Sequence, residues 1–197
     1  MTKAHRPLLV VLTGPSGAGK DSLLARLKSK DPSSYIVANV TTRPPRAGEK
    51  EGVDYHFVSK ADFERLLREG ELLEHAVVYD QDKGVPRAPI REALASGRDV
   101  LLRTDIQGAR TIKRLVPGAT TIFVSPPSEA ELRRRVRERA ADTQEQVRVR
   151  EETATQEMAA APEFDYQVVN DDLDECANDI RRIISEERSR HDREVTV

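Results

Sequence analysis

A glycine-rich segment near the start constrains this chain most. Residues 14–20, Gly14-Pro15-Ser16-Gly17-Ala18-Gly19-Lys20, directly follow an apolar run from Leu8 to Leu12. Glycines let successive backbone N–H groups point at one phosphate, and a helix that starts behind them adds the positive end of its dipole. The Lys20 ammonium can reach the terminal phosphates of a nucleotide. The pattern predicts a phosphate-binding loop and favours use of a nucleoside triphosphate; the alternative is a plain strand-to-helix turn.

The position after Lys20 departs from the usual pattern. Such loops carry Ser or Thr there, whose hydroxyl helps to hold Mg²⁺, whereas this chain has Asp21 followed by Ser22. A carboxylate can also ligate Mg²⁺, a hard cation that prefers oxygen. The other interpretation is that Asp21 only caps the helix. Both stay open, and the predicted nucleotide-binding segment is Gly14, Pro15, Ser16, Gly17, Ala18, Gly19, Lys20, Asp21 and Ser22.

The composition limits the class of protein. The chain has 197 residues, of which 38% are hydrophobic and 34% charged, which suits one large domain with a highly charged surface. The net charge of −2 argues against nucleic-acid binding, which needs a basic surface. Cys176 is the single cysteine, so no internal disulfide can form and a reducing cytoplasm is expected. No apolar run is long enough to span a membrane. We expect the protein to be a monomer or a homodimer.

Strand-like apolar runs alternate with helical patterns along the chain. The runs at 8–12, 100–102 and 120–124 are typical of buried strands, and 35–40 predicts a further short strand. This alternation predicts an α/β fold in which helices cover both faces of a largely parallel sheet, giving three layers. Ligands of such sheets bind beyond the carboxyl ends of the strands, and the glycine-rich loop follows the first strand at that edge.

Two stretches interrupt the alternation. Residues 36–86 are polar and rich in turns, which predicts an inserted substrate-binding subdomain. Residues 136–152 are highly charged, which is typical of a weakly packed lid. The core of this single domain is expected to comprise residues 8–35, 87–135 and 153–190.

Several arginines are candidates for a phosphoryl-transfer site. Such a site needs positive charge around the moving phosphate, and the planar guanidinium group can bind two phosphate oxygens at once. Arg43 and Arg46 lie in a loop stiffened by two prolines. Arg135 and Arg139 lie four residues apart on one helix face, and Arg150 follows in the next helical segment. The plain alternative for the charged helix is a solvated surface.

Taken together, the motifs resemble those of the guanylate kinases, which transfer the γ-phosphate of ATP to GMP. Beyond the glycine-rich loop, the resemblance rests on the segments Thr41-Thr42-Arg43-Pro44-Pro45-Arg46, Gly52-Val53-Asp54-Tyr55-His56-Phe57, Gly70-Glu71-Leu72-Leu73-Glu74, Asp105-Ile106-Gln107-Gly108-Ala109-Arg110 and Val169-Asn170-Asp171-Asp172-Leu173. It implies a P-loop fold with an inserted nucleoside-monophosphate-binding subdomain and a lid. It also implies a Mg²⁺-dependent kinase whose ligands are ATP and GMP.

The resemblance also implies a role for each matching residue. Arg43, Arg46 and Tyr55 would bind the phosphate of GMP, while Glu74 and Asp105 would accept hydrogen bonds from the N1–H and N2–H groups of guanine. The plain alternatives are a surface carboxylate for Glu74 and a helix cap for Asp105. The implied catalytic cations are Lys20, Arg43 and the lid arginines Arg135, Arg139 and Arg150, and Asn170 would lie near the base of ATP.

Three places depart from the family pattern. Family members usually carry Ser where this chain has Asn39, and Tyr-Gly-Ser or Tyr-Gly-Thr where it has Lys83-Gly84-Val85. Asn39 and Lys83 are still expected to contact GMP. At Lys83, the positive charge can replace the phosphate contact that the tyrosine makes in the family. Arg103 stands where the family has an acidic residue. We expect this change to be linked to Asp21: either Asp21 takes over the metal contact, or the two side chains form an ion pair.

Two other functions stay open. The segment Gly19-Lys20-Asp21-Ser22-Leu23-Leu24 also resembles ribose 1,5-bisphosphate phosphokinases of the same superfamily, so the acceptor could be a sugar phosphate or another nucleotide. Guanylate-kinase-like domains can also serve as binding modules without catalysis. Such modules typically lack the loop lysine and the lid arginines, all of which are present in this chain.

Overall fold

The core of the molecule is a sheet of five parallel strands. In the computed structural model, which describes residues 6–78, 81–137, 153, 157–190 and 195–197, the strand order is β2-β7-β1-β8-β9. All neighbouring strands pair in parallel, so the predicted parallel sheet is confirmed. The strands are β1 (Leu9–Thr13), β2 (Tyr35–Ile36), β7 (Val100–Arg103), β8 (Thr120–Ser125) and β9 (Tyr166–Val169).

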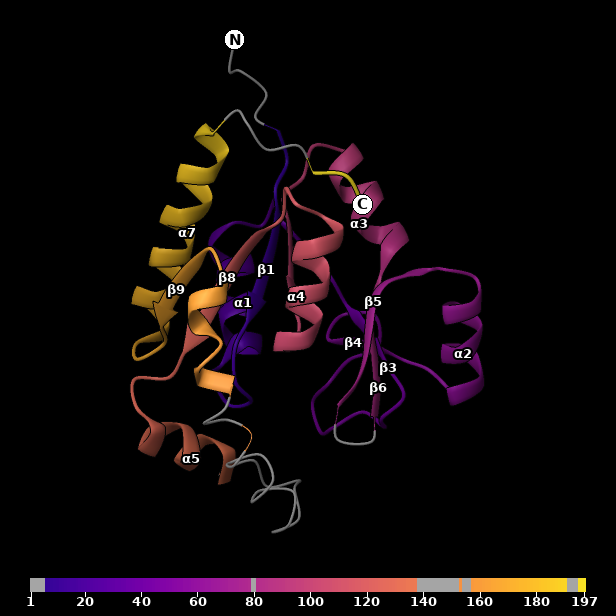
Figure 1. Ribbon diagram of the computed structural model, residues 1–197, viewed down its shortest axis with the longest axis horizontal. Helices are drawn as coiled ribbons and strands as arrows, with labels where there is room; N and C mark the ends of the chain where they lie inside the picture. Colours follow the sequence, from indigo (N-terminus) through magenta and orange to yellow (C-terminus); the bar gives the residue numbers. More distant parts are fainter. Residues whose placement is uncertain (1–5, 79–80, 138–152, 154–156, 191–194) are drawn as a thin grey trace.

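Helices cover both faces of this sheet, which gives the three layers that the sequence predicts (Figure 1). Side chains alternate along β1 because successive residues of a strand point to opposite faces. Val10 and Leu12 pack with helices α1 (Lys20–Lys30) and α7 (Leu173–Ser189). Leu9 and Val11 belong to the opposite core, whose helices are α3 (Arg87–Ala95), α4 (Ile106–Leu115) and the short 3₁₀ helix η1 (Ala161–Glu163).

A second, smaller sheet stands beside the core, in the order β4-β3-β6-β5. Helix α2 (Lys60–Arg68) packs on it through Phe63 and begins at Ser59, a residue type that commonly caps helices, whose hydroxyl accepts a hydrogen bond from the Asp62 N–H at 3.1 Å. The strands are β3 (Asn39–Thr41), β4 (Tyr55–Phe57), β5 (Leu72–Val78) and β6 (Gln81–Pro86).

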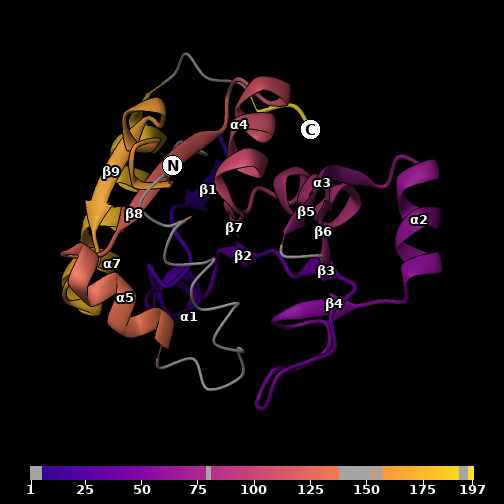
Figure 2. The ribbon, with the colours of Figure 1, turned by 60° about the horizontal axis from the view of Figure 1, so that its bottom comes forward.

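The single strand predicted at 35–40 was wrong, because the chain changes sheets within it. Residues 35–36 pair with β7 in the core, whereas residues 39–41 pair with β4 and β6 in the second sheet. The chain therefore crosses between the sheets at this point. In Figure 2, helix α5 (Glu129–Arg137) lies at the left of the view, and the loop between β3 and β4 reaches to the bottom. Among the helices that the structure describes, none is long and apolar enough to cross a membrane.

A buried carboxylate ties the first strand of the core to its last helix. Asp99, which is 3% exposed, precedes β7. Its Oδ1 accepts the N–H of Leu8 at 2.8 Å, and its Oδ2 accepts a hydrogen bond from Arg188 Nε of α7 at 2.7 Å. A buried charge is tolerated when it is paired in this way, and removal of one partner leaves the other uncompensated.

We predict that Arg188→Met lowers the free energy of unfolding by about 3 kcal/mol, because it strands the Asp99 carboxylate in the core. Urea denaturation measures this. The matched control is Arg182→Met on the same helix, where the ion pair with Asp179 is exposed and should contribute less than about 0.5 kcal/mol. Equal losses in the two variants would contradict this account of Asp99.

Candidate active site

The predicted order of strand, glycine-rich loop and helix is confirmed. Residues 14–19, called the phosphate loop below, leave β1 and lead into α1, whose N-cap is Gly19. Gly14 adopts a φ of 135°, and a Cβ at this position would lie 2.2 Å from the carbonyl oxygen of Val124 in β8. A larger residue could not follow this path. The loop therefore lies directly against the carboxyl end of the core sheet, where the sequence predicts it.

Lys20 and Asn170 both contact this loop. The Lys20 Nζ donates hydrogen bonds to the carbonyl oxygens of Gly14 and Pro15, at 2.6 and 2.9 Å. Asn170 is 5% exposed, and its Nδ2 donates to the carbonyl oxygen of Ala18 at 2.7 Å. Its backbone N–H donates to Ser125 at the end of β8. Asn170 therefore braces the phosphate loop against the ends of β8 and β9.

An open cleft joins the phosphate loop to the second sheet. It brings together most of the residues that the sequence singles out. The predicted site residues that line it are Gly14, Ser16, Gly17, Gly19, Lys20, Asp21, Asn39, Tyr55, Glu74, Lys83 and Asp105. Four further residues line it without having been predicted as site residues: Gly84, Arg103, Thr104 and Glu157.

Arg43 and Arg46 lie near this cleft but do not line it. Arg43 is 6% exposed, and its guanidinium donates two hydrogen bonds of 2.6 Å to the Glu49 carboxylate. The backbone N–H of Arg46 donates to the same carboxylate at 2.7 Å. Arg43 also lies 4.8 Å from the centre of the Tyr55 ring. Glu49 thus organises the β3–β4 loop and holds Arg43 beside a residue of the cleft.

Of the three arginines assigned to the lid, Arg135 is among the described residues. Arg135 lies on α5, where its Nε donates to Glu131 at 2.7 Å and its Nη2 donates to the carbonyl oxygen of Asn170 at 3.1 Å. That contact joins α5 to the residue that braces the phosphate loop. Arg139 and Arg150 lie outside the described residues, as does nearly all of the predicted lid at 136–152.

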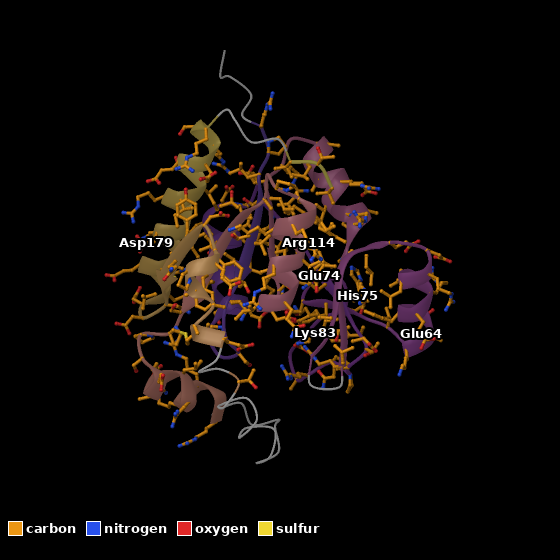
Figure 3. The ribbon with its side chains drawn as sticks, in the orientation of Figure 1. Glu64, Glu74, His75, Lys83, Arg114 and Asp179 are labelled. Carbon is orange, nitrogen blue, oxygen red and sulfur yellow. The ribbon has the colours of Figure 1, made fainter. Side chains whose placement is uncertain are left out.

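Glu74 is a buried carboxylate, so its interpretation as a surface residue was wrong. It lies in β5, is 5% exposed and follows an irregularity in the pairing of β5 with β6, a feature that redirects side chains. Its Oε2 accepts a hydrogen bond from the Thr104 hydroxyl at 3.4 Å. Figure 3 shows Glu74 on the side of β5 that faces α4 and His75 on the side toward α2.

A glycine in α4 makes room for this carboxylate. A Cβ on Gly108 would lie 2.7 Å from both Cδ and Oε1 of Glu74, so the helix can approach β5 only with glycine at this position. The burial of Glu74, followed by the nearby charge of Asp105, raises the pKa of the Glu74 carboxyl to about 7. Asp105 itself caps α4, where its Oδ1 accepts the N–H of Gly108 at 2.9 Å. The helix-cap interpretation of Asp105 is confirmed.

Asp21 forms an ion pair with Arg103, as one of the two linked hypotheses predicts. The cap interpretation of Asp21 was wrong, since Gly19 is the N-cap of α1 and the helix has no side-chain cap. Arg103 also donates through Nη2 to the carbonyl oxygen of Asp54 at 2.7 Å. Its own carbonyl oxygen accepts a hydrogen bond from Asn39 Nδ2 at 2.7 Å.

Glu157 is a charged cleft residue that sequence reasoning missed. Its Oε2 accepts the N–H of Ser16 in the phosphate loop at 3.3 Å, and burial raises the pKa of its carboxyl. Nothing marks it in the sequence, where it is one of many charged residues after the predicted lid. It contacts the loop from a segment more than 140 positions away, a separation that no local pattern reveals.

We predict that burial of Glu74 makes stability depend on pH. The carboxyl titrates near 4.5 when unfolded and at about 7 when folded. Because the folded-state pKa is the higher one, its contribution to stability is complete below pH 4.5 and is lost as the pH rises through 7. Relative to wild type, Glu74→Gln should therefore gain up to about 3 kcal/mol of unfolding free energy at about pH 8, and less at about pH 5.

Urea denaturation at the two pH values measures this difference. Glu64→Gln is the matched control, because it removes the same formal charge from an exposed position on α2 (Figure 3). The gain should be specific to Glu74→Gln. A difference between the two variants that stays constant with pH would contradict the account.

A phosphate-binding loop that follows the central strand of a parallel sheet, with helices on both faces of that sheet, defines a P-loop kinase fold. The sequence profile of the family described as Guanylate kinase matches residues 6–187. The chain belongs to the guanylate kinase family.

Individual relatives agree over nearly the whole chain. The guanylate kinase of Zymomonas mobilis subsp. mobilis is 41% identical over 193 residues, which cover 98% of this chain and 89% of the relative. The guanylate kinase of Synechococcus sp. strain CC9902 is 46% identical over 173 residues, covering 88% and 92%. The crystal structure of guanylate kinase from Anaplasma phagocytophilum superimposes with a TM-score of 0.81 at 33% identity, covering 96% of this chain and 90% of that chain.

Proposed function

We propose that this protein is a phosphotransferase that moves the γ-phosphate of ATP to GMP, giving ADP and GDP. Membership of the guanylate kinase family supports this proposal. The observation that carries it is a single cleft with the phosphate loop at one end and the buried Glu74 carboxylate at the other. The loop suits a triphosphate, and a carboxylate can accept the two adjacent N–H groups of a guanine base.

The reaction needs two anions to come together, and the cleft contains fixed cations for this purpose. Lys20 and Arg103 line it near the loop, and Lys83 lines it on β6. In the proposed step, a phosphate oxygen of GMP attacks the γ-phosphorus in line while the bond to the β-phosphate oxygen breaks. No covalent intermediate with the protein forms. Positioning and charge neutralisation supply the rate enhancement.

We further propose roles for the residues around the cleft. Tyr55, with Arg43 and Arg46, binds the phosphate of GMP, and Glu74 and Asp105 bind its base, helped by Asn39 and Lys83. Arg135, Arg139 and Arg150 act on the phosphates of ATP from the lid, and Asn170 lies near that nucleotide. The core comprises residues 8–35, 87–135 and 153–190, the GMP-binding insert 36–86 and the lid 136–152. A cytoplasmic monomer or homodimer fits these roles.

Mg²⁺ fits this site as a companion of ATP. Its ligands are oxygens, most of which the triphosphate and water provide, and it would neutralise phosphate charge. The carboxylate at the start of α1 is Asp21, which is paired with Arg103. Within the described part of the chain there is no cluster of three or more His, Cys, Asp or Glu residues that could hold a metal by itself. The proposed protein contribution is therefore a shared one, in which Asp21 keeps its ion pair with Arg103 and, with Ser22 beside it, also offers oxygen to the metal.

The main alternative is a different acceptor. Val85, which stands where family members carry Ser or Thr, is 1% exposed and belongs to the apolar core beside α4. Its side chain does not line the cleft. The buried Glu74, by contrast, suits a base with N–H donors better than a sugar phosphate. The cleft therefore favours GMP over ribose 1,5-bisphosphate.

The experiment is an assay of ADP release with ATP and, in turn, GMP, dGMP, AMP, IMP and ribose 1,5-bisphosphate. GMP should give the highest kcat/KM. Lys20→Ala should fold normally and lose about 100-fold in kcat, because it removes the positive charge that neutralises the transferred phosphate. Lys60→Ala, an exposed lysine at the start of α2, is the control and should behave like wild type. Preference for the sugar phosphate, or no turnover with any acceptor, would overturn the proposal.

We also predict that the KM for GMP falls as the pH rises from about 6 to about 8. Ionised Glu74 accepts hydrogen bonds from guanine, and its carboxyl has a pKa of about 7, so protonation below that value weakens binding. The phosphate of GMP itself titrates at about 6. Glu74→Gln keeps that titration, so its profile should lack only the step near pH 7. Identical pH profiles for the two enzymes would contradict the assignment of Glu74.

A further inference from the structure

Arg103 is a buried cation that contacts both halves of the cleft. It is the last residue of β7, and as a residue it is 7% exposed. Its guanidinium pairs with Asp21 on α1 and donates to the carbonyl oxygen of Asp54 at 2.7 Å. It also lies 4.5 Å from the centre of the Tyr55 ring. One side chain of the core sheet therefore contacts the helix behind the phosphate loop and the second sheet.

The contact with Asp21 has an electrostatic consequence. Asp21 directly follows Lys20 and lines the cleft beside the phosphate loop. The Asp21 side chain is 54% exposed, so water weakens its charge, but an uncompensated carboxylate beside the phosphate loop would still repel a bound triphosphate, because charges this close are only partly screened. The Arg103 guanidinium offsets this charge. The pair leaves the phosphate loop free to attract anions through its backbone and Lys20.

The contacts with the second sheet have a geometric consequence. Two guanidinium groups lie over the Tyr55 ring, that of Arg43 at 4.8 Å and that of Arg103 at 4.5 Å from its centre. The carbonyl oxygen of Arg103 also accepts the amide of Asn39 at 2.7 Å. Arg103 thus attaches β3 and the start of β4 to the end of β7. This attachment fixes the position of Tyr55 in the cleft.

We propose that Arg103 is a positioning residue with two separable tasks. It neutralises Asp21, which allows the phosphates of ATP to bind, and it holds Tyr55 where the phosphate of GMP binds. The inference rests on the proposed function, since it assigns the two ends of the cleft to ATP and GMP. It adds that one arginine, outside the motifs of the phosphate loop and of the β3–β4 loop, links the two sites.

The test uses three variants: Arg103→Met, Asp21→Ser and the double variant. Calorimetry with a non-hydrolysable ATP analogue gives the Kd, and steady-state kinetics give the KM for GMP and kcat. Arg103→Met should weaken both ligands by about tenfold, through an unpaired charge at one end and a loose tyrosine at the other. The double variant should bind the ATP analogue within about threefold of wild type, because serine is the residue that such loops usually carry at this position and its hydroxyl can help to hold Mg²⁺, but it should keep the raised KM for GMP.

A purely structural role for Arg103 gives a different pattern. It would change ATP and GMP binding together, and Asp21→Ser would rescue neither. Arg103→Lys provides a second test if Arg103→Met does not fold: it keeps the charge but not the planar group, so ATP binding should persist while the KM for GMP rises. Arg98→Met is the matched control, since Arg98 also stacks on a tyrosine, Tyr35, at 5.3 Å, but does not line the cleft.

The outcomes separate this inference from the proposed function. If wild type fails to phosphorylate GMP, the proposed function itself fails. If wild type is active and both Arg103 variants retain its Kd for the ATP analogue and its KM for GMP, only the role of Arg103 is overturned. Rescue of both ligands, or of neither, in the double variant would also overturn the two separable tasks.

Discussion

Parallel strands end at the same edge of a sheet, and the whole candidate site depends on this constraint. The phosphate loop follows β1, and Arg103, Thr104 and Asp105 come at the end of β7, which pairs with β1. Asn170 follows β9 and braces the loop from the other side. Because these groups leave the sheet together, one edge provides an anion cradle, a buried cation and a capped helix. The second sheet needs only to face this edge to complete a cleft.

The junction of the two sheets combines charge burial with function. Glu74 is pressed against α4 at Gly108, which raises the pKa of its carboxyl to about 7. That burial works against stability once the carboxyl ionises, but it places an acceptor for N–H groups where water competes little. Arg103 shows the opposite arrangement, since its buried charge is paired. The cleft thus holds a buried charge that its surroundings compensate, at Arg103, and another that a ligand would compensate, at Glu74.

Local patterns predict the parts of this molecule that local physics determines. The glycine-rich loop, the buried strands of the core and the cap at Ser59 all follow from spacing and residue type within a few positions. The sequence did not reveal β6, whose residues Gln81–Pro86 are mostly polar and become a strand only by pairing with β3 and β5. Glu157 was missed for the same reason, because its contact with Ser16 joins distant segments. The paired hydrogen bonds from Arg43 to Glu49 were not predicted from the sequence either.

The most direct measurement is a crystal structure of the protein with GMP bound. The account places the guanine base in the cleft with N1 and N2 at hydrogen-bonding distance, about 2.9 Å, from the carboxylate oxygens of Glu74. It places the phosphate beside Tyr55, on the side of the cleft that Arg43 and Arg103 flank. A base bound elsewhere, with no contact between it and the Glu74 carboxylate, would contradict the central claim.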